Sequence, residues 1–290
     1  MTQLQIAKKQ VYKKKLTRSE RRIAFLSRII LWIMIAIVLF PIIAVVSASM
    51  ADGQSFTQAS LFPETWTLKN YAAVLTETDF LLWVKNTLII SLVVATIQLI
   101  LTIPSAFAFS RLKFWGRKKG LMMLLLLQMF PAAMALPAIL GIAYKIGAMD
   151  NIWALVIIQC GGSAYNIWLM KGFIDGIPKE LTEAAYMDGA TTLQTFVTVI
   201  LPLTKNMLIV IFLFSFIGSY GEFVFASALL KDPSSQTIAT GLQGFITGNF
   251  SANWTQYSAA AIMACIPIVC LFGVSQKYIA DGLVSGSVKG

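Results

Sequence analysis

Residues 178–202 read PKELTEAAYMDGATTLQTFVTVILP and form a polar segment between two strongly apolar ones. The proline that opens the segment suits the first turn of a helix, and Lys179 to Met187 are mostly good helix formers. Gly189 follows at a position that favours a left-handed backbone, and Thr191 with Gln194 has the spacing of a capping box. The segment is therefore predicted to fold as a helix, a sharp turn and a second helix.

The first of these two helices has one small, mostly apolar face. Leu181, Ala184, Ala185 and Asp188 are spaced at i, i+3, i+4 and i+7, so their side chains lie on the same side. Small side chains allow another protein to approach the backbone closely. We interpret the face as a docking surface for a partner; an ordinary alanine-rich loop of a membrane protein is the alternative.

The composition indicates an integral membrane protein. The chain has 290 residues, of which 57% are hydrophobic and 12% charged, whereas a soluble domain carries about 25% charged residues. The net charge of +10 would suggest nucleic-acid binding in a soluble protein. Here the basic residues gather in two clusters that border apolar runs, which indicates membrane orientation instead. Nucleic acid is therefore excluded as a partner.

Known catalytic patterns are missing from the sequence. The chain has no histidine, and Cys160, Cys265 and Cys270 lie in apolar runs without the spacing of a zinc site or a disulfide framework. It also has no nucleophile elbow, Walker A loop or glycine-rich dinucleotide fingerprint. We expect no cofactor bound by this chain, so any ATP and magnesium would be bound by other subunits.

Six apolar runs are long enough to cross a bilayer, which gives an all-α integral membrane fold. The predicted spans are 29–50, 88–109, 121–143, 152–170, 207–230 and 258–275. A basic segment, 1–28, precedes the first span, and the cluster Arg111 to Lys119 follows the second. The loop 51–83 between them has four acidic residues and one lysine. The positive-inside rule therefore places both termini, including the tail 277–290, in the cytoplasm. A cleavable signal peptide is disfavoured because the first apolar run is too long.

Two spans contain residues that suggest a transport path. Gln128, Pro131 and Pro137 lie in the third span, where prolines predict local unwinding that must face protein or a water-filled path. Glu222 lies deep in the fifth span, where an acid is costly unless it faces a polar path or a partner. The alternatives are a merely bent packing helix for the third span and a carboxylate that reaches the outer interface for Glu222.

The outer loop 231–257 is rich in Ser, Thr, Asn and Gly and contains interspersed aromatic residues. This composition suits contact with a sugar or a sugar-binding protein, and it also suits an ordinary surface loop. The candidate contact residues are Phe245, Asn249, Phe250 and Trp254.

The spacing of residues 183–202 resembles the EAA loop of the membrane subunits of ABC importers. That loop has Glu-Ala-Ala, three residues, Gly, nine residues, Val, one residue and Leu-Pro. In the family it is the coupling helix, which sits in a cleft of the ATP-binding subunit. The resemblance implies that the coupling residues are Glu183, Ala184, Ala185, Asp188, Gly189, Ala190, Leu201 and Pro202.

From about residue 86 to its end, the chain is similar to MalG-type permeases of the maltose and maltodextrin class of ABC importers. The motifs are LQMFP at 127–131, Trp168 with KGF at 171–173, SYGEF at 219–223, and the ending GLVSGSVKG at 282–290. The resemblance implies a type I importer permease core over 84–276 in a bacterial cytoplasmic membrane. It implies as partners a second permease subunit, an ATPase dimer, an extracytoplasmic binding protein and an oligosaccharide.

In that family the last residues reach into the ATPase dimer, and the outer loop between the last two helices contacts the binding protein. The tail residues so implied are Ser285, Gly286, Ser287, Val288, Lys289 and Gly290. Maltose and maltodextrins are the expected substrates, with galactooligosaccharides or another glycan as alternatives. An ion-coupled secondary transporter and a membrane enzyme are disfavoured because Glu222 stands almost alone and no catalytic residues converge.

Overall fold

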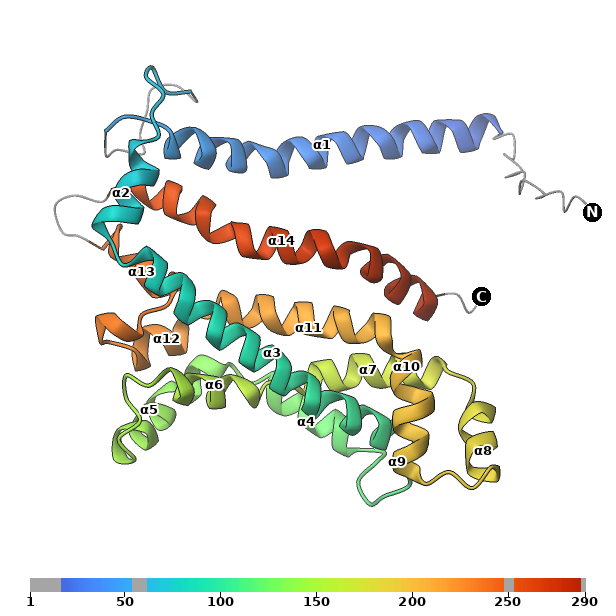
Figure 1. Ribbon diagram of the computed structural model, residues 1–290. Coiled ribbons are helices and arrows are strands. Elements are labelled where there is room, and N and C mark those ends of the chain that lie inside the picture. The colour runs from blue at the N-terminus through green and yellow to red at the C-terminus, as the bar shows by residue number, and fades with distance from the viewer. Residues whose placement is uncertain (1–16, 54–61, 248–252, 288–290) are drawn as a thin grey trace, which may run out of the picture.

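The computed structural model describes residues 17–53, 62–247 and 253–287, with side chains described up to residue 278, and this part of the chain is helical. The one β-bridge there joins Ala51 to Trp66. The long helices α1, α11 and α14 run in roughly the same direction, whereas α8 and α9 run across it (Figure 1). Their bounds are α1 Arg18–Ser49, α2 Lys69–Glu77, α3 Phe80–Arg111, α4 Gly120–Gln128, η1 Ala132–Ala135, α5 Leu136–Lys145, α6 Ile152–Cys160, α7 Ala164–Gly176, α8 Lys179–Met187, α9 Thr192–Thr195, η2 Phe196–Ile200, α10 Leu201–Leu203, α11 Lys205–Tyr220, α12 Val224–Leu229, η3 Pro233–Ser235, α13 Ile238–Gly244 and α14 Trp254–Ser287.

Four stretches are long and apolar enough to cross a membrane: Arg18–Ser49, Phe80–Arg111, Lys205–Leu229 and Trp254–Tyr278. Two bent pairs of helices bring the number to six if each pair is one span. The predicted all-helical membrane fold is therefore confirmed, with four to six candidate spans in the described residues. No strand occurs in the ranges that the structure describes.

The third and fourth predicted spans are broken rather than continuous. Between α4 and α5 the chain bends by 80°, and between α6 and α7 by 46°. The first break follows from Pro131, which cannot donate a backbone hydrogen bond and stands just before the short helix η1. The second break falls at Gly161 and Gly162, which are poor helix formers.

Several helices extend beyond the predicted membrane spans. The first helix begins at Arg18, before the predicted span 29–50, because Thr17 and Glu20 form a capping box within the basic segment. The second begins at Phe80, so the loop 51–83 contains α2 and the start of α3. The last helix continues to Ser287, so most of the predicted tail is helical.

Helix α3 lies at the centre of the bundle and packs against α11, α7 and α6. Three buried apolar clusters follow it from end to end. One cluster contains Phe107 and Met170, a second contains Phe80 and Tyr220, and a third contains Ile90 and Leu155. Since each cluster joins α3 to different helices, α3 organises the whole core.

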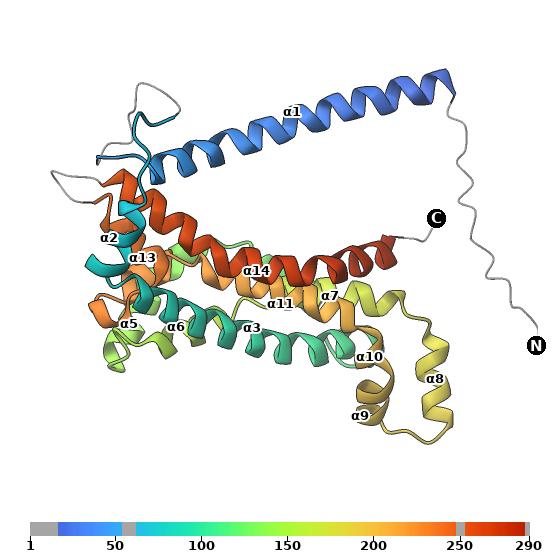
Figure 2. The same ribbon diagram turned by 45° about the horizontal axis from the view of Figure 1, so that its top comes forward.

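Helix α1 is peripheral. It approaches α14 near its C-terminal end and diverges from α14 towards its N-terminal end, as both views show (Figures 1 and 2). Its buried residues are confined to Ser47, Ala48 and Ser49. The amide of Asn70 holds that end by donating to the carbonyl oxygens of Ser49 at 2.9 Å and Ala51 at 2.8 Å.

The end of the bundle that carries α5, α12 and α13 is fixed by polar contacts. Asp150 has a left-handed backbone with φ +57°, and its Oδ1 accepts the backbone N–H of Lys231 and, at 2.7 Å, that of Asp232. The amide of Asn86 donates to the carbonyl oxygens of Ser234 at 3.0 Å and Gln236 at 2.9 Å. These bonds tie the segment after α12 to both α3 and the α5–α6 turn.

Candidate functional site

The segment 178–202 projects from one end of the bundle as a helical hairpin (Figure 2). Helix α8 follows Pro178, and α9, the π-helix η2 and α10 return the chain to the core. Gly189 has φ +84°, and Thr191 and Gln194 bond reciprocally at 3.2 and 2.7 Å. The predicted helix, turn and capping box are therefore confirmed.

The outer surface of the hairpin is exposed and partly apolar. Glu183, Ala184 and Asp188 are exposed, while Met187 and Leu193 at the tip have exposed fractions of 87% and 70%. Contiguous exposed apolar patches are typical of surfaces that bind another protein. The docking role of the hairpin stays a prediction.

The predicted coupling residues have different positions within the hairpin. Ala185 and Ala190 are half-buried, and Gly189 and Pro202 are exposed. Leu201 packs against the buried cluster that contains Phe107 and Met170. Leu201 therefore anchors the hairpin to the bundle instead of contributing to its exposed surface.

A cavity of about 750 Å³ lies where three helix breaks meet. The breaks are the α4–η1, α6–α7 and α11–α12 junctions, and they contribute Phe130, Gly162 and Glu222 to its wall. Gln128 and Glu222 line this cavity, as the interpretation of a transport path requires. Pro131 lies at the first break, between the lining residues Phe130 and Ala132.

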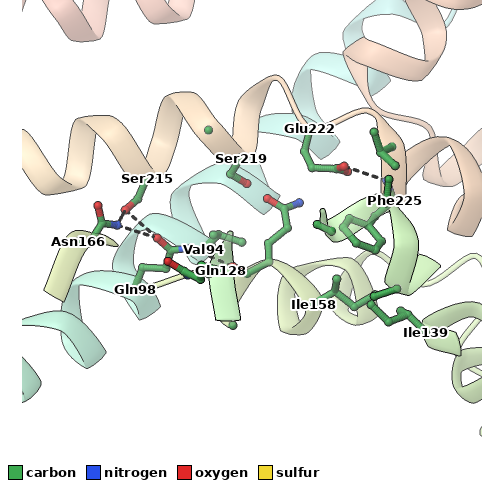
Figure 3. A pocket seen from close by; sticks show the side chains of 18 of the residues that line it. Val94, Gln98, Gln128, Ile139, Ile158, Asn166, Ser215, Ser219, Glu222 and Phe225 are labelled. Atoms are coloured by element: carbon green, nitrogen blue, oxygen red, sulfur yellow. Dashed lines mark hydrogen bonds between the residues drawn. The ribbon is translucent and has the colours of Figure 1, made fainter. Parts of the chain in front are cut away.

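A cluster of buried amides and hydroxyls forms one end of the cavity (Figure 3). The Oε1 atom of Gln98 in α3 accepts from Asn166 Nδ2 at 3.1 Å and from Ser215 Oγ at 2.9 Å. Asn166 also donates to Ser215 at 3.0 Å, and Gln98 Nε2 donates to the carbonyl oxygen of Gln159 at 2.9 Å. The cluster joins α3, α6, α7 and α11.

Glu222 forms the other end of the cavity, where it caps α12 (Figure 3). Its two carboxylate oxygens accept the backbone N–H groups of Phe225 at 2.8 Å and Ala226 at 2.9 Å. A carboxylate at a helix N-terminus is stabilised by these donors and by the helix dipole. Glu222 therefore lies at a break and not within a continuous helix as predicted, and its half-buried carboxylate has a local partner.

Two buried groups on the cavity wall have no hydrogen-bond partner among the described residues: Gln159 Nε2 and Ser219 Oγ. A buried polar atom without a partner costs about 1–3 kcal/mol, so such atoms indicate a place for water or a polar ligand. They add hydrogen-bonding capacity to a cavity that also has phenylalanine side chains in its wall.

Sequence reasoning missed most of this cavity. It selected Gln128 and Glu222 and passed over a set of polar residues in apolar runs: Gln98, Gln159, Asn166, Ser215 and Ser219. The available signal was the cost of amides at membrane depth, which marks functional positions in general. This cost does not reveal which of these residues contact one another, because they come from four different helices.

The described residues of the segment 231–257, which are 231–247 and 253–257, include η3, α13 and the start of α14. Phe245 is half-buried and lies edge-on to Trp83, with ring centroids 6.2 Å apart. Trp254 lies 5.8 Å from Tyr257, while Asn249 and Phe250 are outside the described residues. Ser234 donates its N–H and O–H to Asp232, which lowers the pKa of that carboxyl.

The predicted tail residues have no described side chains. Ser285, Gly286 and Ser287 belong to the last turn of α14. Val288, Lys289 and Gly290 lie outside the described residues. Their contact with an ATPase stays a prediction.

Comparison with known proteins identifies the family. Residues 92–284 match the family model described as "Binding-protein-dependent transport system inner membrane component". The chain is 38% identical to the maltodextrin transport system permease MdxG of Bacillus subtilis, over 88% of this chain and 92% of that protein. It is 33% identical to the maltose/maltodextrin permease MalG of Escherichia coli K12, over 94% and 98%. The resemblance to MalG-type permeases is thus confirmed.

Two further similarities bear on fold and substrate. The galactooligosaccharides permease GanQ of Bacillus subtilis is 34% identical over 91% of this chain and 95% of its own length. A chain from a bacterial ABC transporter that imports the acidic polysaccharide alginate superposes with a TM-score of 0.77 at 26% identity. It covers 91% of this chain and 99% of its own. The expected importer permease fold is confirmed, and the chain belongs to the family of inner membrane components of binding-protein-dependent transport systems.

Proposed function

We propose that the chain is one of two permease subunits of an ATP-driven importer of maltose and maltodextrins. The similarity to MdxG and MalG over most of both chains supports this assignment. The cavity supports it physically, because sugars are bound by amides, hydroxyls and aromatic rings, and this wall supplies Gln128, Gln159 and Phe130. The remaining half of the path would come from the second permease subunit.

Galactooligosaccharides are the second candidate. They are favoured by the 34% identity to GanQ, which is close to the value for MalG. The two candidates differ in the stereochemistry of their sugar units and linkages. Polar groups placed on a cavity wall can discriminate between such substrates, because a missing partner leaves a buried group unsatisfied.

In this proposal the hairpin of α8 and α9 couples the permease to the motor. The exposed Glu183 and the small Ala184 would sit in a cleft of the ATPase subunit, with Met187 and Leu193 in apolar contact beside them. ATP and magnesium would be bound by the ATPase dimer and no cofactor by this chain. Leu201 packs in the core, so movement of the hairpin would be passed to the membrane helices.

Both termini are on the cytoplasmic side in this proposal. The end of the bundle that carries α8 is also where α1 begins, α3 ends and α14 ends (Figure 2). The basic cluster that follows α3 therefore lies on the same side as the hairpin, and basic loops favour the cytoplasm. The described parts of the segment 51–83, which are residues 51–53 and 62–83, contain four acidic residues and one lysine and lie at the opposite end.

The transport step would be alternating access through the cavity. ATP binding would draw the hairpin inward and rotate the membrane helices, which would open the path outward while the binding protein delivers its sugar. Gln128, Pro131 and Glu222 would belong to this path. Phe245, Asn249, Phe250 and Trp254 would belong to the region that meets the binding protein.

An ion-coupled secondary transporter is less compatible with these features. Such a transporter uses intramembrane carboxylates or cations that bind the coupling ion. Glu222 is the one acidic residue among those that line the cavity, and its carboxylate is already engaged by Phe225 and Ala226.

The test is ATP hydrolysis by the reconstituted complex with its own binding protein. We expect maltose and maltodextrins to stimulate hydrolysis and to accumulate in the vesicles only when ATP is present. Stimulation by galactooligosaccharides alone would replace the maltodextrin assignment. Sugar uptake by this chain without an ATPase would overturn the importer assignment.

A further inference from the structure

A second cavity, away from the transport path, lies beside the loop between α3 and α4. It has a volume of about 960 Å³ and is lined by residues 113–120 together with Phe109, Met123 and Lys171. We call it the basic-loop cavity. None of the coupling or path residues belongs to it.

The loop beside this cavity has a fixed shape. Arg117 donates through Nε to the carbonyl oxygen of Phe109 at 3.0 Å and through Nη2 to that of Ser110 at 2.6 Å. Phe114 packs edge-on against Phe109, with ring centroids 5.2 Å apart. Gly116 makes the turn with φ +89°. The backbone of the loop is therefore fixed at the end of α3, and this fixes the positions from which the basic side chains extend.

The wall of the basic-loop cavity is strongly positive. It contains five basic residues and no acidic one: Lys113, Arg117, Lys118, Lys119 and Lys171. Lys171 is paired with Asp175 at 2.5 Å, and Arg117 is occupied by the two carbonyl oxygens. Lys113, Lys118 and Lys119 are exposed, and no acid of the described chain pairs with them. Three like charges around one space favour the binding of an anion.

The helix that follows this loop has exposed apolar residues. Met123 lines the basic-loop cavity and is exposed on α4, as are Met122 and Leu126 on the same short helix. Trp115 at the loop has an exposed fraction of 98%. Tryptophan with lysine is the typical pair at a membrane–water interface, and α4 belongs to one of the bent pairs that would span the membrane.

We propose that the basic-loop cavity binds the head group of an anionic phospholipid. Lys113, Lys118 and Lys119 contact the phosphate, Trp115 lies at the level of the glycerol ester groups, and the acyl chains run along the apolar face of α4. A free phosphate would use the lysines and not the apolar surface, and an acidic face of a soluble subunit would leave that surface uncovered. The lipid accounts for both parts, and the inference holds whichever sugar is transported.

The test uses the complete complex purified in detergent and supplied with phosphatidylglycerol or phosphatidylcholine, with bound lipid counted by native mass spectrometry. The variant is Lys113→Gln/Lys118→Gln/Lys119→Gln. The matched control is Lys69→Gln/Lys85→Gln/Lys145→Gln, which removes three exposed lysines from the opposite end of the bundle. We expect the affinity for phosphatidylglycerol to fall at least about tenfold in the variant alone, because each lysine at an anionic surface contributes about fivefold.

Two further measurements separate the possible anions. Trp115→Ala is expected to weaken phosphatidylglycerol binding without affecting inorganic phosphate. Equal displacement of the lipid by inorganic phosphate in both Trp115 forms would show a simple anion site and overturn the proposal. The proposal would also be overturned if the lysine variant kept its lipid, whether or not that variant lost the ATPase subunits. If the triple variant does not assemble, the double variant Lys118→Gln/Lys119→Gln replaces it in the same lipid-binding measurement.

Discussion

The indole ring of Trp83 in α3 lies directly on the backbone of Gly241 in α13. A Cβ atom at Gly241 would lie 2.2 Å from Cδ2 of that ring, far inside any normal contact. The same indole is edge-on to Phe80 at 6.4 Å and to Phe245 at 6.2 Å. A bare backbone at residue 241 thus lets α13 lie against the end of α3.

Gly241→Ala should destabilise this end of the molecule. The added methyl group cannot fit unless Trp83 or α13 moves, and such overpacking costs about 1–3 kcal/mol. Gly244→Ala is the control, because a Cβ there meets nothing within 4 Å. Thermal unfolding of the purified complex should show a lower midpoint for Gly241→Ala alone. Equal midpoints for both variants would mean that the contact with Trp83 contributes little to thermal stability.

Reversing the charge of Glu183 should uncouple transport from ATP hydrolysis. Glu183 and Glu180 are both exposed on α8, and only Glu183 belongs to the predicted coupling motif. We expect Glu183→Lys to leave the protein in the membrane and to abolish sugar-stimulated hydrolysis, whereas Glu180→Lys retains most of it. Normal sugar uptake by reconstituted Glu183→Lys would contradict the coupling role.

Gly189→Ala should weaken the coupling to the ATPase by changing the backbone conformation of the turn after α8. A residue with a side chain at φ +84° pays about 1–2 kcal/mol for the left-handed conformation, so the turn after α8 should shift. Gly176→Ala is matched, because residue 176 is helical and a Cβ there meets nothing within 4 Å. The measurement is the amount of ATPase retained when the permease is purified. Equal retention by both variants would argue against a role of this turn in coupling.

The two kinds of polar residue in the cavity should respond differently to substitution. Gln98→Leu removes the partner of Asn166, Ser215 and Gln159, and each group left unsatisfied costs about 1–3 kcal/mol. Ser219→Ala removes a hydroxyl that has no partner, so the free energy of unfolding should not fall.

Sugar uptake distinguishes a structural from a binding role for Ser219. We expect the uptake rate of Ser219→Ala to fall although its thermal midpoint is unchanged. If Ser219→Ala lowers the midpoint as much as Gln98→Leu does, the hydroxyl belongs to the structural cluster instead.

Asp150→Ala should loosen the connection between the α5–α6 turn and the end of α12. It removes the acceptor for the N–H groups of Lys231 and Asp232, and alanine tolerates φ +57° poorly. Asp150→Asn keeps an oxygen acceptor and tolerates that conformation. Hydrogen exchange at residues 231 and 232 should rise in the alanine variant only. Unchanged exchange there would show that the two N–H groups are protected by other means.

The sequence predicted local structure well where the determining residues are close together. The Gly189 turn and the Thr191–Gln194 cap depend on neighbours within one or two turns, and both are present. The apolar runs likewise predicted where spans occur. The first helix begins before the predicted span, because Thr17 caps it inside a basic segment that is too polar for hydropathy to reveal.

Contacts between distant residues were beyond a reading of the sequence. Gln98, Asn166 and Ser215 are isolated polar residues along the chain and meet only once α3, α7 and α11 are packed. Glu222 was noticed because an acid in an apolar run is costly. Its capping of α12 depends on a helix break at Gly221 that the surrounding composition does not reveal.

Helix α14 has 34 residues and is therefore about 51 Å long, while the hydrocarbon core of a bilayer is about 30 Å thick. A good part of it must extend beyond the hydrocarbon core at one or both faces. Ser285, Gly286 and Ser287, which are expected to meet the motor, thus lie on a helix that is continuous with a membrane span. A small tilt of α14 inside the lipid would sweep its far end sideways through a larger arc.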